Sequence, residues 1–587
     1  MPTTTLPLSC LYRLALGSLS MMALGSCGFI NRVPTANSFE SAQQALERSI
    51  LPKIDLREEY VDSAVAARYS VDTIEEPLPS IDDFPLYGAQ PSRDPNTVTL
   101  EILTSSEKAN VSRQNERWLV DVAERFNQEG FTLDSGERIQ VGIRQVASGT
   151  AARLLIAGEV DSAGYSPSND FWVAMIEDAG VETLSVVPRL VPNTAGWVVQ
   201  KEVYDRLEAE GDVSFEGLLG QILAGTVAVG YPNPYSSSTS LNLLYTLFWG
   251  AAGHQESGDP LTLLDLESPA VNSVFNTFQQ QVLISTTTTL DLQEIFIRDP
   301  DQLQAFPLEY QNFQTLVTLP GFRDVEFIPF GIPHNNPLVG FGWNDPEEQE
   351  ALEQFGEYAS SPAMQALAVE QGFVETPYLT QVDQHPPLPN GEILTAAQTY
   401  WKGQKDAGRT VYMMIVVDVS GSMSGSPLTA VKEGLRVAST EINAGNQVGM
   451  IAFNETPTYL LPLAPFDVPH HQSFLAAIDS LRADGLTGTY DAMMVALSDL
   501  MKQANQDPDG RYYLLLLSDG DTNRGFRLNQ ISSILENSNV RIYPIAYGSG
   551  ANRAELESIA ALRESTVQVG TVDNVQTLLK GLLQTNL

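Results

Sequence analysis

Apolar residues recur along most of the chain in short runs that alternate with amphipathic segments. Residues 98–104 and 139–146 are apolar runs of strand length. Between them, residues 113–127 place Trp118 and Phe126 on one face of a predicted helix. The same alternation continues to residue 375. Strands that alternate with helices predict a mostly parallel sheet with crossover connections, so the expected fold class is α/β.

A second region with this pattern occupies residues 409–587 and has longer apolar strands. Residues 411–417 and 512–517 are uninterrupted apolar runs, as expected of central parallel strands. The region is predicted to be a doubly wound, mostly parallel, Rossmann-like domain. Its other predicted strands are 447–453, 459–463, 540–547 and 566–570, and its predicted helices include 427–443, 552–564 and 572–585.

The first 26 residues have the pattern of an export signal. Arg13 precedes an apolar run from Leu14 to Leu24, which is too short to span a bilayer. The sequence Leu24-Gly25-Ser26-Cys27 resembles the lipobox of bacterial lipoproteins. The resemblance implies cleavage before Cys27, lipidation of Cys27 and anchoring in the cell envelope, facing the periplasm or exterior. Cys10 would leave with the signal. The alternative is a buried N-terminal helix with an incidental cysteine.

Charge narrows the range of partners. The chain has 33 Lys and Arg against 72 Asp and Glu, a formal net charge of −39. Phosphate binding needs clustered basic residues, so this balance argues against nucleic acid. Residues 75–85 are acidic and rich in proline, and we expect a spacer there. The predicted organisation is a signal peptide at 1–26, an acidic tether at 27–95, a first domain at 96–375, a linker at 376–408 and a second domain at 409–587.

Hydroxyl side chains cluster after several predicted strands of the first domain. Ligands gather at the carboxyl ends of parallel strands, and helix N-termini there can bind an anion or a polar group. The clusters therefore predict a cleft for a small polar or anionic solute, although each could equally be an ordinary helix cap. Glu309 and Tyr310 could also reach the cleft. The candidate ligand-binding residues are Ser105, Ser106, Ser148, Thr150, Tyr165, Ser168, Ser236, Ser237 and Thr239.

The first domain resembles the type II periplasmic solute-binding proteins. The resemblance is carried by Phe355–Gln365, by the following Gln371-Gly372-Phe373 and by the serine-rich turn at 236–240. It implies a two-lobed fold with a cleft between the lobes. Residues 250–320 match poorly and could carry insertions.

In the second domain, polar residues follow two of the predicted strands and open one helix. Asp418, Ser420 and Ser422 follow the strand 411–417, Asp519 follows the strand 512–517, and Thr487 precedes a predicted helix. These five groups supply only oxygen ligands, which favour Mg²⁺ or Mn²⁺ over Zn²⁺. With two charged ligands, the ion would keep a position for water or for an outside carboxylate.

These residues also resemble the metal-ion-dependent adhesion site of von Willebrand factor A (VWA) domains. Asp418-x-Ser420-x-Ser422 matches the first motif, Thr487 the threonine element and Asp519 the last aspartate. Thr489 is the nearest rival of Thr487. The resemblance implies that an acidic residue of a protein partner completes the shell of the ion.

The sequence predicts a binding protein rather than an enzyme. It has no G-x-S-x-G elbow, no P-loop and no H-E-x-x-H motif, and nothing marks a base beside the metal. The expected function is adhesion or envelope assembly through the VWA domain, with the first domain as a second recognition or sensor unit. The alternative is a solute receptor of an ABC-type importer with an accessory VWA domain. A metal-dependent hydrolase is a weaker third hypothesis.

Overall fold

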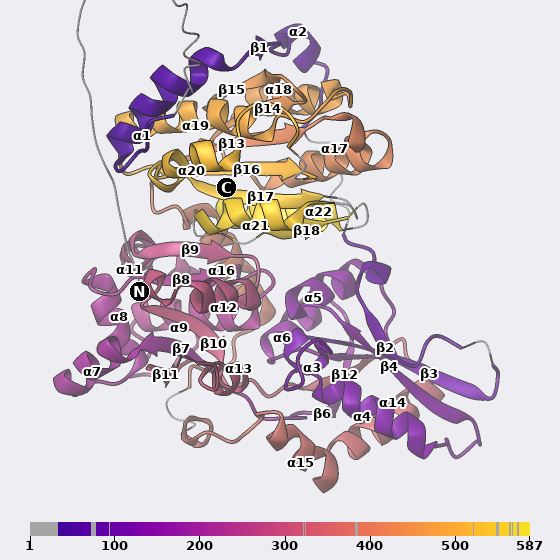
Figure 1. Ribbon diagram of the computed structural model, residues 1–587. Coiled ribbons are helices and arrows are strands. Elements are labelled where there is room, and N and C mark those ends of the chain that lie inside the picture. Colours follow the sequence, from indigo (N-terminus) through magenta and orange to yellow (C-terminus); the bar gives the residue numbers. More distant parts are fainter. Residues whose placement is uncertain are drawn as a thin grey trace, which may run out of the picture.

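The computed structural model describes residues 33–71, 78–92, 94–320, 322, 324–381, 385–519, 522–547, 551–562, 565, 567–571 and 574–587. Cys10, Cys27 and the predicted signal peptide lie outside these residues. Figure 1 shows three α/β bodies: two lobes built from the first part of the chain, and a C-terminal domain above them. Within the described ranges, every helix is too short or too polar to cross a bilayer.

The first lobe is a six-stranded sheet with the strand order β2-β4-β3-β5-β12-β6. The central strands β3, β4 and β5 run parallel, and the outer strands β2, β12 and β6 are antiparallel to their neighbours. The strands are β2 (Leu86–Gly88), β3 (Thr97–Thr104), β4 (Arg138–Gln145), β5 (Gly164–Ser166), β6 (Thr183–Val187) and β12 (Leu338–Phe341). Its main helices are α4 (Trp118–Glu129), α5 (Ser148–Ala157), α6 (Phe171–Asp178), α14 (Pro346–Ala359) and α15 (Pro362–Glu370).

The second lobe is a five-stranded sheet with the order β11-β7-β10-β8-β9. Its strands are β7 (Ala195–Gln200), β8 (Val229–Pro232), β9 (Val282–Thr286), β10 (Ala305–Glu309) and β11 (Val325–Pro329). Its helices include α7 (Lys201–Glu210), α8 (Phe215–Leu223), α9 (Ser238–Ala251), α11 (Pro269–Gln280), α12 (Thr289–Arg298) and α13 (Tyr310–Leu316). Within residues 250–320, the elements α10 (Leu263–Leu266), α11, β9, α12, β10 and α13 therefore belong to the lobe itself, where the sequence suggested insertions.

The chain crosses between the lobes twice, at 188–194 and at 330–337. The two crossings pair with each other, because Asn193 and His334 exchange backbone hydrogen bonds of 3.0 and 3.1 Å. Two sheets joined by paired crossings place a cleft between them. The predicted two-lobed α/β fold of the first domain is confirmed by this topology.

The C-terminal domain is a seven-stranded sheet with the order β1-β15-β14-β13-β16-β17-β18. All its neighbouring strands are parallel except β14 and β15, so the predicted doubly wound fold is also confirmed. Its strands are β13 (Val411–Asp418), β14 (Gln447–Phe453), β15 (Pro457–Pro465), β16 (Arg511–Ser518), β17 (Arg541–Tyr547) and β18 (Gln568–Gly570). The helices α17 (Ser426–Ala438), α18 (Val468–Ser480), α19 (Thr489–Gln506), α20 (Leu528–Glu536), α21 (Arg553–Leu562) and α22 (Val575–Asn586) cover it.

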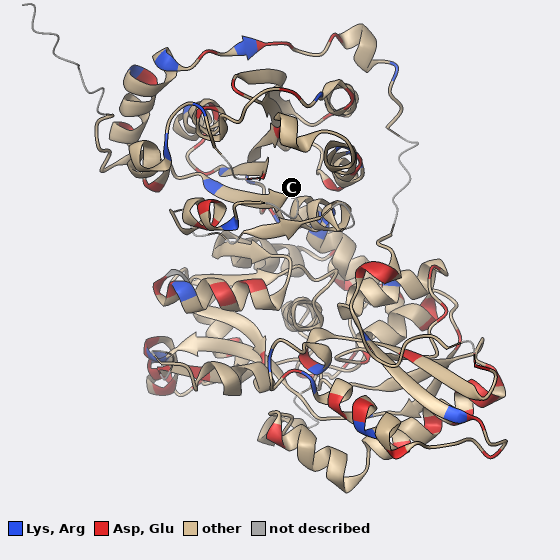
Figure 2. Ribbon diagram, turned by 45° about the vertical axis from the view of Figure 1, so that its right-hand side comes forward, with Lys and Arg blue, Asp and Glu red and all other residues tan. Residues whose placement is uncertain are grey.

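Residues 33–71, which the sequence suggested to be part of a tether, instead pack on the C-terminal domain. The strand β1 (Arg57–Glu58) extends the sheet beside β15, and α1 (Phe39–Ala45) and the following π-helical turn (Leu46–Ile50) join the hydrophobic core. Ala42, Leu46 and Ile50 are completely buried. Their spacing of four puts them on one helical face, but the segment is too short for that period to stand out in the sequence. Acidic residues are distributed over the helices of all three bodies (Figure 2).

The sequence placed residues 376–408 in a linker with a helix at 394–404. The helix is present as α16 (Gly391–Gln404), but it belongs to the core of the first domain and not to a linker. Its Leu394 and Ala397 are completely buried, and the Trp401 indole donates to the Tyr231 hydroxyl at 2.6 Å. The helix packs on α6 of the first lobe and on α9 of the second, and only a short connection separates it from β13.

Candidate functional site

The five predicted metal ligands lie on three loops at the carboxyl edge of the C-terminal sheet. Asp418 ends β13, Asp519 directly follows β16, and Thr487 lies two residues before α19. Backbone hydrogen bonds tie two of these loops together, because Gly421 N–H donates to Gly485 O at 3.1 Å and Asp484 N–H donates to Val419 O at 2.8 Å. The doubly wound topology thus brings together residues that are a hundred positions apart in the sequence.

Asp418 is the buried carboxylate of this group. Its side chain is completely buried; Oδ1 accepts from the Ser420 N–H at 2.8 Å and Oδ2 accepts from the Ser518 hydroxyl at 2.8 Å. Burial raises the pKa of Asp418 to about 6. Ser518 was not singled out as a site residue from the sequence, although its position at the end of β16 beside Asp519 was the available signal.

The other predicted ligands connect to Asp418 through hydroxyl groups. The Ser420 and Ser422 hydroxyl oxygens lie 3.0 Å apart, and the Ser422 hydroxyl donates to Asp519 Oδ2. Thr487 is held from a different direction: its N–H donates to Asn523 Oδ1 at 3.1 Å, and its carbonyl oxygen accepts from Asn523 N–H at 3.0 Å. Asn523 is a second positioning residue that sequence reasoning missed.

The donor set fits a hard divalent cation. It consists of two carboxylates and three hydroxyls, and among the described residues no Lys or Arg forms an ion pair with Asp418. The hydroxyl of Thr489, the rival of Thr487, is buried without a hydrogen-bond partner in the described structure. No three His, Cys, Asp or Glu side chains of the described ranges gather around one point, so any ion here depends on the hydroxyl ligands.

One side of this group faces solvent. Asp418 and Ser420 are buried, whereas Ser422 is exposed and the apolar side chain of Leu486 is 42% exposed. An ion held by these residues would therefore keep a coordination position open to an outside group, beside an exposed apolar side chain.

A second candidate site lies in the cleft between the two lobes of the first domain. Its cavity has a volume of about 120 Å³. Tyr165 does not reach it, because the Tyr165 hydroxyl is buried and donates to Ser148 O at 2.7 Å, and Thr150 lies on another wall, near α22. The remaining predicted residues do line the cavity: Ser105, Ser106, Ser148, Ser168, Ser236, Ser237 and Thr239.

The cleft also contains acidic residues that the sequence did not place there. Glu107 and Glu116 come from the first lobe, and Glu309, which was considered as a candidate, comes from the end of β10 in the second lobe. Asn312 lines the same cavity and donates to Glu116 at 2.8 Å across the lobes. Nothing in the local sequence around Glu107 or Glu116 separates them from solvated acidic residues.

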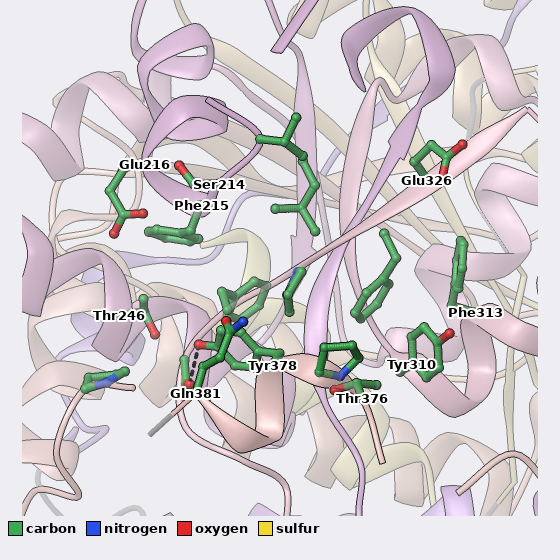
Figure 3. Close-up of a pocket in the computed structure, with 18 of the residues that line it drawn as sticks. Ser214, Phe215, Glu216, Thr246, Tyr310, Phe313, Glu326, Thr376, Tyr378 and Gln381 are labelled. Atoms are coloured by element: carbon green, nitrogen blue, oxygen red, sulfur yellow. Dashed lines mark hydrogen bonds between the residues drawn. The ribbon is translucent and has the colours of Figure 1, made fainter. Parts of the chain in front are cut away.

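A larger cavity of about 800 Å³ lies elsewhere in the second lobe (Figure 3). Phe215, Phe313 and Tyr378 contribute aromatic walls, and Glu216 and Glu326 contribute carboxylates. Tyr310, predicted to reach the inter-lobe cleft, lines this cavity instead. None of the nine predicted ligand-binding residues contributes to it.

Comparison with known proteins agrees with the fold and loops of the C-terminal domain. Residues 413–582 match the profile of the von Willebrand factor type A domain family. Human inter-alpha-trypsin inhibitor heavy chain H4 is 33% identical over 121 residues, which cover 19% of this chain and 13% of that protein. An uncharacterized protein of Synechocystis is 23% identical over 157 residues, which cover 26% of this chain and 36% of that protein. The chain thus spans well under half the length of these relatives.

Solved structures also align with the first domain. The iron-bound protein HitA from Pseudomonas aeruginosa is 15% identical with a TM-score of 0.37, and the alignment covers 53% of this chain and 99% of that one. The two-lobed fold assigned here rests on the strand order and the paired crossings of this chain. The chain therefore combines a region that matches the VWA profile with a two-lobed α/β domain.

Proposed function

We propose that this chain is an extracytoplasmic binding protein, anchored in the cell envelope through Cys27. Its VWA domain binds Mg²⁺ or Mn²⁺ and, through the ion, an acidic residue of a protein partner. The observation that supports this most strongly is the assembly of Asp418, Ser420, Ser422 and Asp519 into one hydrogen-bonded group with a solvent-facing side.

The site suits ligand capture better than catalysis. Asp418 is held by two hydrogen bonds, which orient both of its oxygens before an ion arrives. A bound ion with few anionic ligands attracts a further carboxylate, because its charge is only partly neutralised. The exposed Leu486 beside Thr487 offers an apolar contact that water cannot supply.

Direct metal titration tests this proposal. We expect the purified full chain to bind Mn²⁺ by calorimetry, and Asp418→Ala to abolish the binding. Ser424→Ala is the matched control, because Ser424 is exposed and lies just after the motif. In a pull-down from the cell envelope, one protein should be enriched with Mg²⁺ and lost with chelator or with Asp418→Ala. Enrichment that survives both changes would falsify the proposal.

A second function, solute reception by the first domain, is favoured by the inter-lobe cavity. It is lined by both lobes, and a hydrogen bond between the lobes, from Trp172 Nε1 to the Ser238 hydroxyl at 2.8 Å, involves one of its lining residues. In this role the chain would present a small solute to an ABC-type importer, with the VWA domain as an accessory. Solute-induced stabilisation of the full chain tests it.

A further inference from the structure

Glu309 is a carboxylate of the inter-lobe cleft with one fully buried oxygen that has no hydrogen-bond partner in the described part of the chain. Its side chain is only 7% exposed, and it lines the cavity from the end of β10. Oε1 accepts from the Thr239 hydroxyl at 2.9 Å and from His334 Nδ1 at 2.6 Å. Oε2 is buried and has no hydrogen-bond partner in the described part of the chain.

The histidine beside Glu309 does not cancel its charge. Two hydrogen bonds to the backbone of Ile332 fix the orientation of the Asn242 side-chain amide. Its oxygen accepts from the Ile332 N–H, and its nitrogen donates to the Ile332 carbonyl oxygen. That nitrogen also lies 3.1 Å from His334 Nε2. The side-chain oxygen of Asn169 accepts from a backbone N–H, and its side-chain nitrogen also lies 3.1 Å from His334 Nε2. Nε2 therefore accepts, Nδ1 carries the proton, and the imidazole is neutral.

The carboxylates of the cleft outnumber the basic side chains close to them by one. Glu116 lies 3.1 Å from Arg113, and both of its oxygens also accept hydrogen bonds from asparagine amides. Glu107 lies 3.7 Å from the buried Lys108. Among the described residues, Glu107 and Glu116 each lie within 4 Å of a Lys or Arg, whereas the ion-pair contact of Glu309 is with the neutral His334. Burying an ionised carboxylate without a nearby positive charge costs free energy, which a bound cation would offset.

The lining of the cavity selects among cations. A metal ion would find a single carboxylate without a nearby Lys or Arg here, Glu309, whereas the predicted metal site of the C-terminal domain supplies two carboxylates. A quaternary ammonium is bound by aromatic rings, and no aromatic residue lines this cavity. Serine and threonine hydroxyls surround Glu309 instead, and each has lone pairs that accept from N–H donors. The volume of about 120 Å³ admits only a small molecule.

We propose that the inter-lobe cleft binds a small solute through a primary ammonium group, with the Glu309 carboxylate as its charge partner. This rests on the solute-receptor function proposed above and names the class of the solute. It departs from the polar or anionic solute expected from the sequence, because the serine-rich turns are visible there and the charge of the assembled cleft is not. The ammonium belongs either to a simple amine or to an amino acid, whose carboxylate would face the helix N-termini of α5, α9 and α12.

Thermal unfolding and calorimetry of the full chain test this proposal. The probes are ethanolamine and 1,4-diaminobutane as simple amines, glycine as an amino acid, trimethylated glycine as the matched quaternary analogue, and sulfate and acetate as anions. We expect at least one primary ammonium compound to raise the unfolding temperature and its methylated analogue to leave it unchanged. Binding of glycine alone assigns an amino acid, and binding of an amine alone assigns a simple amine.

The variant Glu309→Gln keeps the shape of the side chain and removes the charge. We expect it to weaken binding of the responding probe about ten- to hundredfold, as the loss of a charged hydrogen bond in a buried site does. Without ligand it should unfold no earlier than the wild type, because an uncompensated buried charge is gone. Glu294→Gln, on the exposed face of α12 in the same lobe, should change neither quantity.

The outcomes distinguish failure of the ammonium assignment from failure of the solute-receptor function. If sulfate or acetate binds and the ammonium probes do not, the cleft is a solute site and the ammonium assignment is overturned. Unchanged affinity in Glu309→Gln overturns the assignment as well. If no probe binds the folded wild-type chain, the solute-receptor function fails together with the assignment, while the metal titration of the VWA domain is unaffected.

Discussion

Single residues decide how closely the two lobes approach each other. Gly149 is the second residue of α5 in the first lobe, and its N–H donates to Ser236 O of the second lobe at 3.4 Å. A Cβ atom at position 149 would collide with the carbonyl oxygen of Tyr235 and lie 2.6 Å from the Trp172 ring. A glycine is therefore required here for the closed arrangement of the lobes.

We expect Gly149→Ala to destabilise the closed first domain by about 1–3 kcal/mol, as overpacking a tight contact does. The expected result is a larger radius of gyration by small-angle scattering and a lower unfolding temperature. Gly220→Ala is the control, since a Cβ at this helical position meets nothing within 4 Å. Identical scattering curves for Gly149→Ala and the wild type would show that the lobes do not need this contact.

A second residue-scale feature is the buried His471 in α18, whose Nε2 lies 2.7 Å from the Ser439 hydroxyl. Burial lowers the pKa of His471 to about 4 from its ordinary value of 6.5. Between these values the unfolded chain binds a proton that the folded chain does not. The free energy of unfolding should therefore fall by about 1–3 kcal/mol as the pH drops from 6.5 towards 4.

His471→Gln should flatten this pH dependence, because glutamine has no proton to bind. Urea unfolding of both proteins at pH 7 and pH 5 measures the difference. Burial lowers the pKa of the neighbouring His470 as well, so part of the slope should remain. An unchanged slope in His471→Gln would assign the acid sensitivity to other groups.

At the scale of elements, the N-terminal segment is part of the VWA domain. Ile50 is completely buried against the core that contains α19 and α20. Ile50→Ala should destabilise the VWA domain by about 2–5 kcal/mol, the cost of a buried large-to-small substitution. Val65→Ala is the control, since Val65 is 43% exposed. Calorimetric unfolding measures the difference. If the N-terminal segment were a free tether, both variants would unfold at the wild-type temperature.

At the scale of the whole molecule, three arginines join the VWA domain to the second lobe. Arg409 and Arg511 donate to Gln279 O at the end of α11, at 2.8 and 3.2 Å, and Arg541 donates to Leu283 O at 2.6 Å. Positive charge at a helix C-terminus is favourable. Arg511 and Arg541 lie at the amino ends of their strands, and the metal-site residues follow the carboxyl ends of β13 and β16, so a partner can reach the site without displacing the first domain.

The double variant Arg409→Ala/Arg541→Ala should loosen this interface, because each lost bond involves a charged donor worth about 1.5–3 kcal/mol. We expect the domains to unfold in two separate calorimetric transitions, with metal binding by the VWA domain retained. Arg298→Ala, an exposed position on α12, serves as the control. A single unchanged transition would mean that the other contacts hold the domains together.

Periodic and motif-bearing segments were predictable from the sequence. The strand at 447–453 was predicted with the bounds that the structure shows, and the strand predicted at 411–417 is one residue longer in the structure. Segments without a long hydrophobic period could not be placed from the sequence. Residues 33–71 have no such period, and the helices and strands of residues 250–320 are short. The partners of the metal motif, Ser518 and Asn523, were missed because their roles depend on which loops become neighbours.

The sequence by itself determined the α/β class, the order of the domains and the residue types of the metal motif, because periodicity and short motifs are local properties. The tertiary structure was needed to show that Thr150 lines another cavity, that the N-terminal segment extends the C-terminal sheet, and that Glu309 Oε2 has no hydrogen-bond partner among the described residues. These features depend on contacts between residues far apart in the chain. Burial and charge balance are set by those neighbours, and no local pattern records them.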